Sequence, residues 1–488
     1  MKAFADNLKR LFTRHEIRVA VCGMQTSGKT VFITSLVDHL LHHDPSGNTS
    51  DARRFDLGDF VIGDDADVKI VHSDGDTIGN FDFPAFRNAF ANNKWPDKTN
   101  RTSELVLDFT LENRRQLFRN PIGFGGAKYR DVRLRILDIP GERMADFLMA
   151  GLDFAEWSDA ILGNGKHRRK HLGAYRERAE ALSAGLDDAQ AESILFAEYR
   201  KALDEAKNAF DRFVTPSVYR IPLVPTSKDF PPPPRLLGLE NKEFAPMTPA
   251  LREKYPALAK QFARHYNEYR DSVVSPIVDW MKTADKALFL LDVFSCLNGG
   301  TQAYNATLAE TNAALDVLGS RGLFDEFCEG VEYLFTRFQF PISSEDIRIV
   351  VTKMDLADET GRNNLLSLAR HMFGKKAQSV TGFRSPDKAF LSCAAVKTDS
   401  ERAGGSGSEP KKAAYPGIPR EKKEARPGDG IPSVIPENLD EWKNCFRLKP
   451  INPAWFNLRD DLPPKHAGLD AIACFLLDIP VPPKAASK

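Results

Sequence analysis

The chain has 488 residues, which at a typical domain length of about 150 is enough for roughly three domain-sized units. Its 67 Lys and Arg balance 67 Asp and Glu, so the net charge of zero argues against a generic nucleic-acid binder, and no nucleic-acid partner is expected. The six cysteines lie far apart without a Cys-x-x-Cys pair, which is typical of reduced, buried thiols in a cytoplasmic protein. We find neither a secretory signal nor an apolar run near the ~18 residues of a membrane-spanning helix.

The first predicted elements are a strand, a loop and a helix. Residues 17–21 alternate with period two, and residues 31–41 carry apolar side chains at helical spacing. Residues 43–101 are irregular and rich in Asp, Gly and Asn, so we expect a long surface connection with one short helix near residues 84–92. Two half-buried strands follow, at residues 105–111 and 132–136.

The rest of the chain begins with long charged stretches in which apolar residues lie three and four apart, the pattern of surface helices. We predict helical stretches at 175–213 and 251–281, with a proline-rich loop at 221–249 between them. Strands follow at 286–293 and 347–351, with a helical stretch at 307–338 between them. Residues 390–394 end the regular part, and a terminal helix is predicted at 467–477.

Strands that alternate with helices, several of them apolar on both faces, predict an α/β fold with an open, mostly parallel central sheet. We expect the core to comprise residues 15–143 and 285–398, and residues 144–284 to form an inserted α-helical domain. Residues 399–435, rich in Gly, Pro, Lys and Glu, predict a flexible linker. Residues 436–488 would be a C-terminal extension whose helix packs on the core.

The strongest motif lies between the first strand and the first helix. Gly23-x4-Gly28-Lys29-Thr30 matches the phosphate-binding loop pattern, in which glycines let backbone N–H groups surround a β-phosphate at a helix N-terminus. Lys29 would span the β- and γ-phosphates, and the Thr30 hydroxyl would bind Mg²⁺. The plain alternative is an ordinary glycine turn. The candidate nucleotide-binding residues of this loop are Gly23, Gln25, Thr26, Ser27, Gly28, Lys29, Thr30 and Val31.

A second motif, Asp138-Ile-Pro-Gly141, follows the strand at residues 132–136. At the carboxyl end of a strand, Asp138 could hold a Mg²⁺-bound water and Gly141 could offer its N–H to a γ-phosphate. The motif is short, so a strand-ending turn is an open alternative. Asp292, which ends a later strand, competes for the acidic role, but we favour Asp138 because it precedes the glycine.

A third motif, Thr352-Lys353-Met-Asp355, is the only [NT]-K-x-D sequence in the chain and follows the strand at 347–351. A carboxylate in the plane of a base can accept both the imino and the amino hydrogens of guanine, which adenine does not present together. Lys353 could lay its alkyl stem along the base. A solvated loop between strand and helix is the alternative interpretation.

Together with Ser392-Cys393-Ala394, these motifs follow the order of the G-motifs of Ras-like GTPases, and nearly the full chain resembles the YcjX family of bacterial P-loop proteins. The resemblance implies a Ras-like P-loop NTPase that hydrolyses GTP to GDP with Mg²⁺ as a conformational switch. Residues 43–101 would be a long switch I segment. The resemblance further implies a stress-response role near the inner membrane and a protein partner there, such as a membrane protein.

The resemblance also assigns residues to roles. It places Thr352, Lys353, Asp355, Cys393 and Ala394 at the base, Lys29, Gly141 and Glu142 in catalysis, and Thr30, Asp138 and a switch I threonine at the metal. Thr99 is our choice for that threonine and Thr102 the second candidate, and either could be a plain loop residue.

Three departures from the pattern of small Ras-like GTPases bear on turnover. Glu142 replaces a water-orienting glutamine, Gln25 replaces a glycine, and Cys393 and Ala395 replace a serine and a lysine. A carboxylate near a γ-phosphate disfavours hydrolysis, so slow intrinsic turnover is expected; the alternative is that Glu142 lies outside the site. Two other functions stay open: an ATPase or nucleotide kinase, and a GDP-bound scaffold that does not hydrolyse.

Two basic features of the sequence each have a functional and an ordinary structural interpretation. Arg143 could stabilise transition-state charge in cis, but a surface charge in switch II is the more ordinary interpretation. The run of basic residues at 166–171 could bind an anionic membrane surface, although such runs are more often solvated loops.

Overall fold

The structure is a computed structural model of the chain. It describes residues 15–23, 27–43, 55–62, 68–72, 77–92, 94–96, 101–113, 129–163, 170–182, 186–208, 216–219, 223, 233–301, 303–305, 307–308, 311–312, 346–357, 359–381, 388–396, 431–442 and 463–482.

One mixed, mostly parallel sheet forms the centre of the described part, in the order β2-β5-β6-β1-β7-β8-β9. Strands β6, β1, β7, β8 and β9 run parallel, and β5 pairs with β6 antiparallel. The sheet confirms the predicted α/β class. The bounds are β1 His15–Gly23, β2 Phe60–Ile62, β3 Lys69–Val71, β4 Gly79–Asn80, β5 Ser103–Asn113, β6 Tyr129–Asp138, β7 Lys286–Leu291, β8 Ile347–Val351 and β9 Phe390–Ser392.

Alternation of side chains along the central strands gives the sheet two apolar faces. In β1, Ile17, Val19 and Val21 belong to the cluster that contains helices α2 (Lys29–Leu41) and α15 (Leu469–Leu476), whereas Ala20 and Cys22 belong to the cluster of the opposite face. In β7 all six residues are buried. Because strands buried on both faces need helices on both, the continuous apolar pattern correctly predicted a covered parallel sheet.

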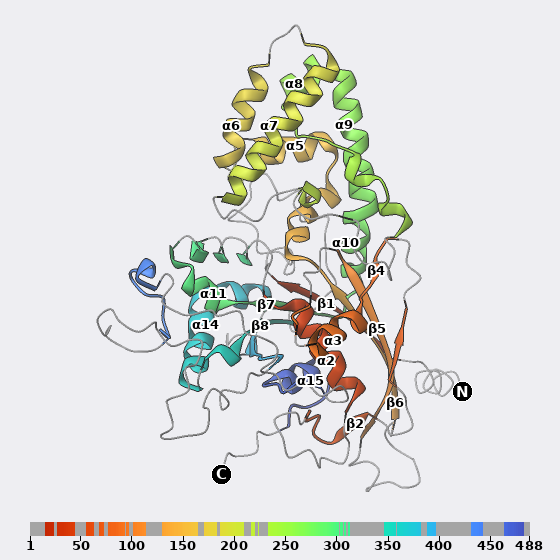
Figure 1. Ribbon diagram of the computed structural model, residues 1–488, viewed down its shortest axis with the longest axis vertical. Coiled ribbons are helices and arrows are strands. Elements are labelled where there is room, and N and C mark those ends of the chain that lie inside the picture. Colours follow the sequence, from red (N-terminus) through yellow and green to blue (C-terminus); the bar gives the residue numbers. More distant parts are fainter. Residues whose placement is uncertain are drawn as a thin grey trace.

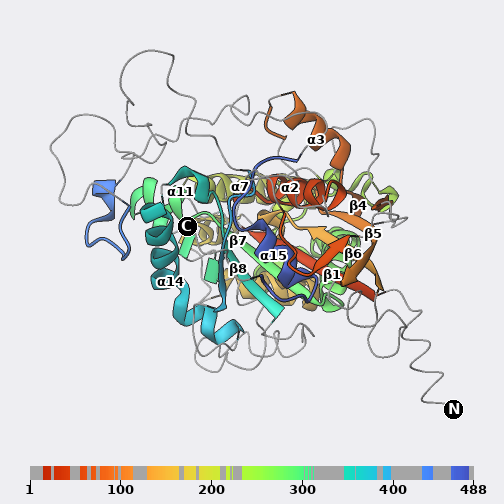
Figure 2. The same cartoon turned by 90° about the horizontal axis from the view of Figure 1, so that it is seen from below.

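Helices cover these faces from widely separated parts of the chain. Buried residues of α2 and α15 share one hydrophobic cluster with the sheet, and those of α14 (Glu359–Thr381) and α10 (Ser275–Lys282) share the other. Figure 2 shows α15, near the C-terminus, beside β1 and β7. The bounds are α2 Lys29–Leu41, α3 Phe83–Ala91, α11 Val293–Asn298, α14 Glu359–Thr381 and α15 Leu469–Leu476.

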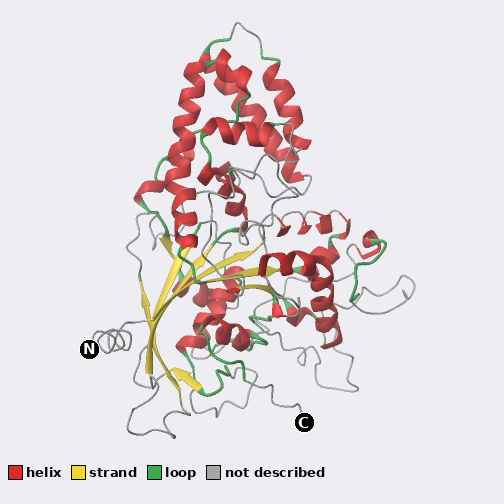
Figure 3. Ribbon diagram, turned by 180° about the vertical axis from the view of Figure 1, so that it is seen from behind, coloured by secondary structure: helices red, strands yellow, loops and turns green. Residues whose placement is uncertain are grey.

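A mostly helical segment falls between β6 and β7 in sequence and lies at one end of the molecule, away from most of the sheet (Figures 1 and 3). It begins with a 3-10 helix, η1, at Gly141–Gly151. The other elements are α5 Phe154–Leu162, α6 Lys170–Glu180, α7 Asp188–Asn208, the short turns η2 Ser217–Tyr219, η3 Pro234–Leu236 and η4 Leu239–Asn241, α8 Pro249–Lys254, α9 Pro256–Tyr269, η5 Arg270–Val274 and α10 Ser275–Lys282.

The last three of these elements form one continuous helical rod that runs from the helical segment down to the sheet (Figure 1). Its middle, η5, is a π-helical turn. Pro276 explains the turn, because a proline has no N–H to donate and its ring clashes with the carbonyl four residues earlier. The sequence pattern predicted one helical stretch here but not the widened turn.

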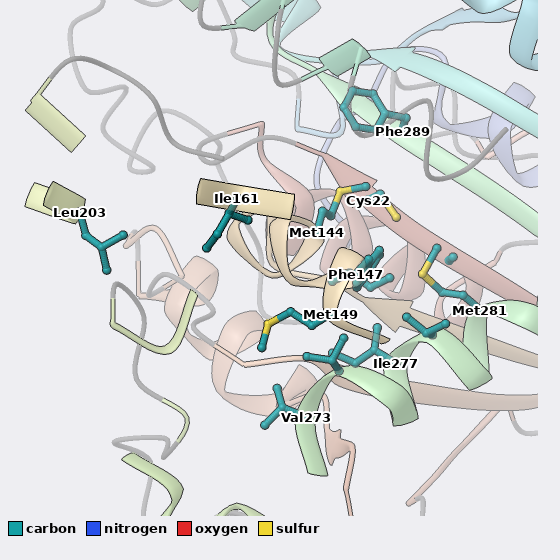
Figure 4. Close-up of a cluster of buried hydrophobic side chains, with 14 of the residues drawn as sticks. Cys22, Met144, Phe147, Met149, Ile161, Leu203, Val273, Ile277, Met281 and Phe289 are labelled. Carbon is teal, nitrogen blue, oxygen red and sulfur yellow. The ribbon is translucent and has the colours of Figure 1, made fainter. Parts of the chain in front are cut away.

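Helix η1 packs between the sheet and this rod. Met144 and Phe147 of η1 lie with Cys22 of β1 and with Ile277 and Met281 of α10 in a single buried cluster (Figure 4). Motion of η1 would therefore have to displace side chains of both the sheet and α10, since close-packed interiors resist local deformation.

The connection before β5 differs from the prediction. Residues 43–101 do contain the expected short helix, α3, but they also contain β2, β3 and β4, which pair with β5. Strands of two or three residues are too short to show an alternating pattern, which is why the expectation of an irregular connection was wrong for these strands.

Several predictions fall largely outside the described residues, namely the helical stretch at 307–338, the linker at 399–435 and the basic run at 166–171. Within the described part, no helix combines the length and apolar character that crossing a bilayer requires. The four cysteines described, Cys22, Cys296, Cys393 and Cys474, are buried and not disulfide-bonded.

Candidate functional site

The candidate phosphate-binding loop joins β1 to α2 at the carboxyl edge of the sheet. Two glycines hold backbone conformations that side chains disfavour: Gly23 has φ 152° and Gly28 has φ 86°. A Cβ on Gly23 would also approach the Leu290 carbonyl oxygen to 2.5 Å. The first glycine is thus needed for close packing against β7, and the second for the left-handed turn that begins α2. Met24, Gln25 and Thr26 lie outside the described residues.

The N-terminus of α2 follows this loop directly. Gly28, as the N-cap, has no side chain that could accept from the first N–H groups of the helix, which suits a helix N-terminus that binds an anion. Lys29 is buried, and its Nζ donates a 2.8 Å hydrogen bond to the Gly23 carbonyl. The ammonium group therefore bridges the two ends of the loop, where a phosphate could take the place of the carbonyl as its acceptor.

Asp138 lies beside the phosphate-binding loop. The parallel register pairs Val21 of β1 with Asp138, the last residue of β6, and Ile139 donates its N–H to the Val21 carbonyl. Asp138 is fully buried. Burial raises the pKa of the Cys22 thiol to about 12, while nearby Lys29 lowers it and nearby Asp138 raises it further. Cys22 therefore lies within electrostatic reach of both the lysine and the carboxylate.

Gly141 and Glu142 begin η1 directly after this strand end, and Glu142 is buried. Arg143 is also buried, so the interpretation as a surface charge was wrong. Its guanidinium donates to Ser217 Oγ at 2.7 Å and to the Tyr269 hydroxyl at 3.0 Å, which lie on η2 and at the end of α9. The arginine is thus engaged with the helical segment.

The Thr352–Asp355 motif contacts the phosphate-binding loop directly. Thr352 Oγ1 donates to the Ser27 carbonyl at 2.8 Å, although 325 residues separate the two in sequence. Lys353 has φ 58°, a conformation that costs free energy for any residue with a Cβ, and Nζ pairs with Asp292 Oδ2 at 2.5 Å. The edge of the sheet thus brings a candidate base-binding motif and a candidate phosphate-binding motif into contact.

Cys393 and Ala394 lie next to the same motif. Met354 donates its N–H to the Cys393 carbonyl at 3.3 Å. Burial raises the pKa of the Cys393 thiol, and the nearby carboxylate of Asp355 raises it further. Ala394 exchanges two 2.9 Å backbone hydrogen bonds with Ala467 of the C-terminal segment, so its N–H is already engaged within the protein.

The structure describes one of the two candidate switch I threonines. Thr99 lies outside the described residues. Thr102 directly precedes β5, whose first residue, Ser103, pairs with Asp138. The Thr102 hydroxyl oxygen is inaccessible to solvent and has no hydrogen-bond partner among the described residues.

Asp292 has a role that sequence reasoning missed. It accepts a hydrogen bond from the Ser295 N–H at 2.9 Å as the N-cap of α11, and it pairs with Lys353. The N-cap role could have been predicted, because an aspartate at the junction of a strand and a helix is a common N-cap pattern. The pairing with a lysine 61 residues away could not, because no local sequence pattern indicates it.

The ligands predicted for a hard cation are all oxygens: the Thr30 hydroxyl, the Asp138 carboxylate and a switch I hydroxyl. Among the described residues, no group of three or more His, Cys, Asp or Glu could by itself hold a metal. A cation here would need phosphate oxygens and water to complete its shell, which is how Mg²⁺ binds with nucleotides.

Comparison with known proteins gives a family match and two named relatives. Residues 17–479 match the YcjX-like family, DUF463. The chain is 25% identical over 413 residues to a protein of Shewanella oneidensis named Ras-like GTPase YcjX, covering 80% of this chain and 78% of that one. It is 24% identical over 511 residues to the Escherichia coli K12 protein of the same name, covering 98% and 99%.

Proposed function

The chain belongs to the YcjX-like family, DUF463, and from this membership and the site geometry we propose that it binds guanine nucleotides and hydrolyses GTP to GDP with Mg²⁺. Relatives covering most of the chain are named Ras-like GTPases. The single observation that carries the proposal is the hydrogen bond from Thr352 to the Ser27 carbonyl, because it ties the candidate base-binding motif to the candidate phosphate-binding loop.

Base selection would rest on Asp355. Its carboxylate lies close to Cys393, on the edge of the sheet shared with the phosphate-binding loop. An ionised carboxylate can accept two N–H groups from guanine, and a site built to satisfy such donors discriminates strongly against a base that lacks them. Thr352, Lys353, Cys393 and Ala394 would complete the base site.

Phosphate binding and hydrolysis would use the loop and the start of η1. Lys29 would neutralise charge on the β- and γ-phosphates, and the Gly141 N–H would donate to the γ-phosphate. Thr30, Asp138 and either Thr99 or Thr102 would hold Mg²⁺, which would supply charge stabilisation on the phosphate oxygens. The buried Glu142 carboxylate would repel a γ-phosphate, so we propose slow intrinsic turnover.

We further propose a Ras-like division of the chain, with residues 15–143 and 285–398 as nucleotide-binding core, residues 144–284 as a helical domain and residues 436–488 as a C-terminal extension. The contacts of Arg143 with Ser217 and Tyr269 support a switch in which η1 carries the nucleotide state to the helices. A stress-response role, a protein partner and a peripheral place at the inner membrane stay predictions of the resemblance.

The experiment is calorimetric titration of nucleotide-free protein with GDP and with ADP, each with Mg²⁺, repeated on Asp355→Asn. We expect GDP to bind at least about a hundredfold more tightly than ADP, because a carboxylate placed to accept two N–H groups from guanine is left unpaired under adenine, and we expect the variant to lose that preference. Equal binding of both nucleotides, unchanged by the substitution, would overturn the proposal and favour an ATP-using enzyme.

The second candidate, a GDP-bound scaffold without turnover, is favoured by Glu142 and by Gln25. Single-turnover hydrolysis of GTP separates it from the first. Product that forms at a rate abolished by Lys29→Ala supports the GTPase, because Lys29 would contact the transferred phosphoryl group. An absence of product from tightly bound GTP supports the scaffold.

A further inference from the structure

The ion pair between Asp292 and Lys353 joins two neighbouring strands at the edge where the candidate site lies. Leu291 of β7 pairs in register with Val351 of β8, so residues that follow the two strands emerge side by side. Lys353 Nζ lies 2.5 Å from Asp292 Oδ2. The Asp292 side chain is 5% exposed and that of Lys353 is 32% exposed, so water reaches the ion pair mainly around the lysine.

The Asp292 carboxylate is held in place by its two different partners. Oδ1 accepts from the Ser295 N–H at the start of α11, and Oδ2 accepts from Lys353. Since the N-cap bond fixes the orientation of the carboxylate, Oδ2 is presented toward the Thr352–Asp355 motif before any ligand binds.

Lys353 needs such a restraint. Its backbone is in the left-handed region, with φ 58°, and a residue with a Cβ stays there only when its surroundings hold it. On one side of it Thr352 is tied to the Ser27 and Leu291 carbonyls, and on the other Met354 donates to the Cys393 carbonyl. The ion pair with Asp292 is the corresponding restraint on the Lys353 side chain.

We propose that Asp292 is a positioning residue for guanine recognition. By holding the Lys353 ammonium, it keeps the lysine stem extended along the face of the guanine base, whose N–H groups Asp355 accepts. The inference rests on the proposed function. Without the aspartate, Lys353 would have to be immobilised by the nucleotide itself, and part of the binding free energy would be lost to side-chain entropy.

A merely structural role for Asp292 makes a different prediction, because its second task is to cap α11. Asparagine is as good an N-cap as aspartate but carries no charge. Asp292→Asn therefore removes the ion pair and keeps the cap. A structural role through the cap would leave this variant like the wild type.

The test uses the full chain and four variants: Asp292→Asn, Lys353→Met, the double variant, and Asp279→Asn as matched control. Asp279 forms an ion pair of similar length with Lys282 on the exposed surface of α10, with Nζ to Oδ1 at 2.7 Å. Two ligands are titrated with Mg²⁺, namely GDP and inorganic pyrophosphate, together with the midpoint of thermal unfolding without ligand. Pyrophosphate reports on the phosphate-binding loop alone.

We expect Asp292→Asn to weaken GDP binding by about three- to tenfold, the cost of immobilising one long side chain, with pyrophosphate affinity and the unfolding midpoint unchanged. The double variant should bind GDP no more weakly than the weaker single variant, since both remove the same interaction. Asp279→Asn should match the wild type in every measurement.

Three outcomes overturn the inference: GDP affinity of Asp292→Asn within twofold of the wild type, equal losses for GDP and pyrophosphate, or additive losses in the double variant. If Asp292→Asn lowers the unfolding midpoint, the deciding measurement is the ratio of GDP affinity to pyrophosphate affinity in Lys353→Met. Wild-type protein that binds GDP no better than ADP removes the proposed function and this inference together, whereas selective wild-type binding that Asp292→Asn leaves intact removes the inference alone.

Discussion

Two glycines show how single residues allow distant segments to approach each other at the edge of the sheet. A Cβ on Gly23 would lie 2.5 Å from the Leu290 carbonyl oxygen of β7. A Cβ on Gly468 would lie 2.2 Å from the Ser392 carbonyl oxygen of β9, and Gly468 has φ 78°. Gly468 thus permits the antiparallel bridge between Ala467 and Ala394, which brings the C-terminal segment to the candidate base site.

Gly468→Ala should destabilise the protein more than the same substitution at a glycine with open space. We expect the free energy of unfolding in urea to fall by about 2–3 kcal/mol, from backbone strain and a clash with an immovable carbonyl. Gly238→Ala is the control, because Gly238 has φ 80° and a Cβ added there would meet nothing within 4 Å, and it should cost about 1 kcal/mol. Equal losses would show that the close approach to Ser392 carries no cost.

At the scale of elements, the junction between η1 and the helical segment is a buried polar network. Asp146 accepts from the Ser217 N–H at 2.8 Å and from the Tyr269 hydroxyl at 2.6 Å, and Arg143 donates to both Ser217 and Tyr269. Burial raises the pKa of Asp146, while Arg143 and the hydrogen bonds from Ser217 and Tyr269 oppose that shift. Such a network stabilises only when its members are all satisfied, because each charge is deprived of water.

Tyr269→Phe should therefore cost about 1–3 kcal/mol of unfolding free energy, since it deprives a buried carboxylate and a buried guanidinium of a partner. Tyr266→Phe is the matched control: Tyr266 is equally buried, but within the described part of the chain its hydroxyl donates to uncharged groups alone, the Met149 and Leu152 carbonyls at 3.2 and 3.1 Å. Its loss should be about 0.5–1.5 kcal/mol. Equal losses in urea unfolding would argue against a special role for the charged network.

At the scale of the whole molecule, the C-terminal segment packs on α2 through a group of aromatic rings. His39 of α2 stacks on Phe55 with ring centroids 5.2 Å apart and meets His466 edge-on at 4.4 Å. Burial lowers the pKa of His39 well below its ordinary value of 6.5, and charge on His466, His42 or His43 would lower it further. A hydrogen bond with the Pro464 backbone opposes this shift.

A lowered pKa in the folded state makes stability depend on pH in one direction. Below about pH 6.5 the unfolded chain binds a proton at His39 that the folded chain does not bind, so the stability present above that pH is lost as the pH falls. The slope should approach about 1.4 kcal/mol per pH unit. His39→Phe should flatten this part of a urea-stability profile between pH 5 and 7.5, whatever its effect at pH 7.5. An unchanged slope would assign the acid sensitivity to other groups.

The sequence by itself determined the class of the fold and the order of the motifs. Apolar runs buried on both faces, such as residues 286–291, require a covered parallel sheet, and Gly23–Thr30 placed a phosphate-binding pattern between its first strand and helix. These features were readable because local periodicity and local backbone demands produce them. The sequence did not predict the short strands β2, β3 and β4, because they depend on pairing with β5. Nor did it predict the π-helical turn, because the way in which the chain accommodates Pro276 depends on neighbouring structure.

Only the tertiary structure decided which distant residues meet. It placed Thr352 against Ser27, Lys353 against Asp292, and Arg143 inside a network with the helices, where sequence suggested a surface charge. The physical reason is that the carboxyl ends of parallel strands converge at one edge of a sheet whatever their separation along the chain. Residue types indicate which chemistry is available, whereas the register of β1, β6, β7 and β8 selects the partners that hold those residues in position.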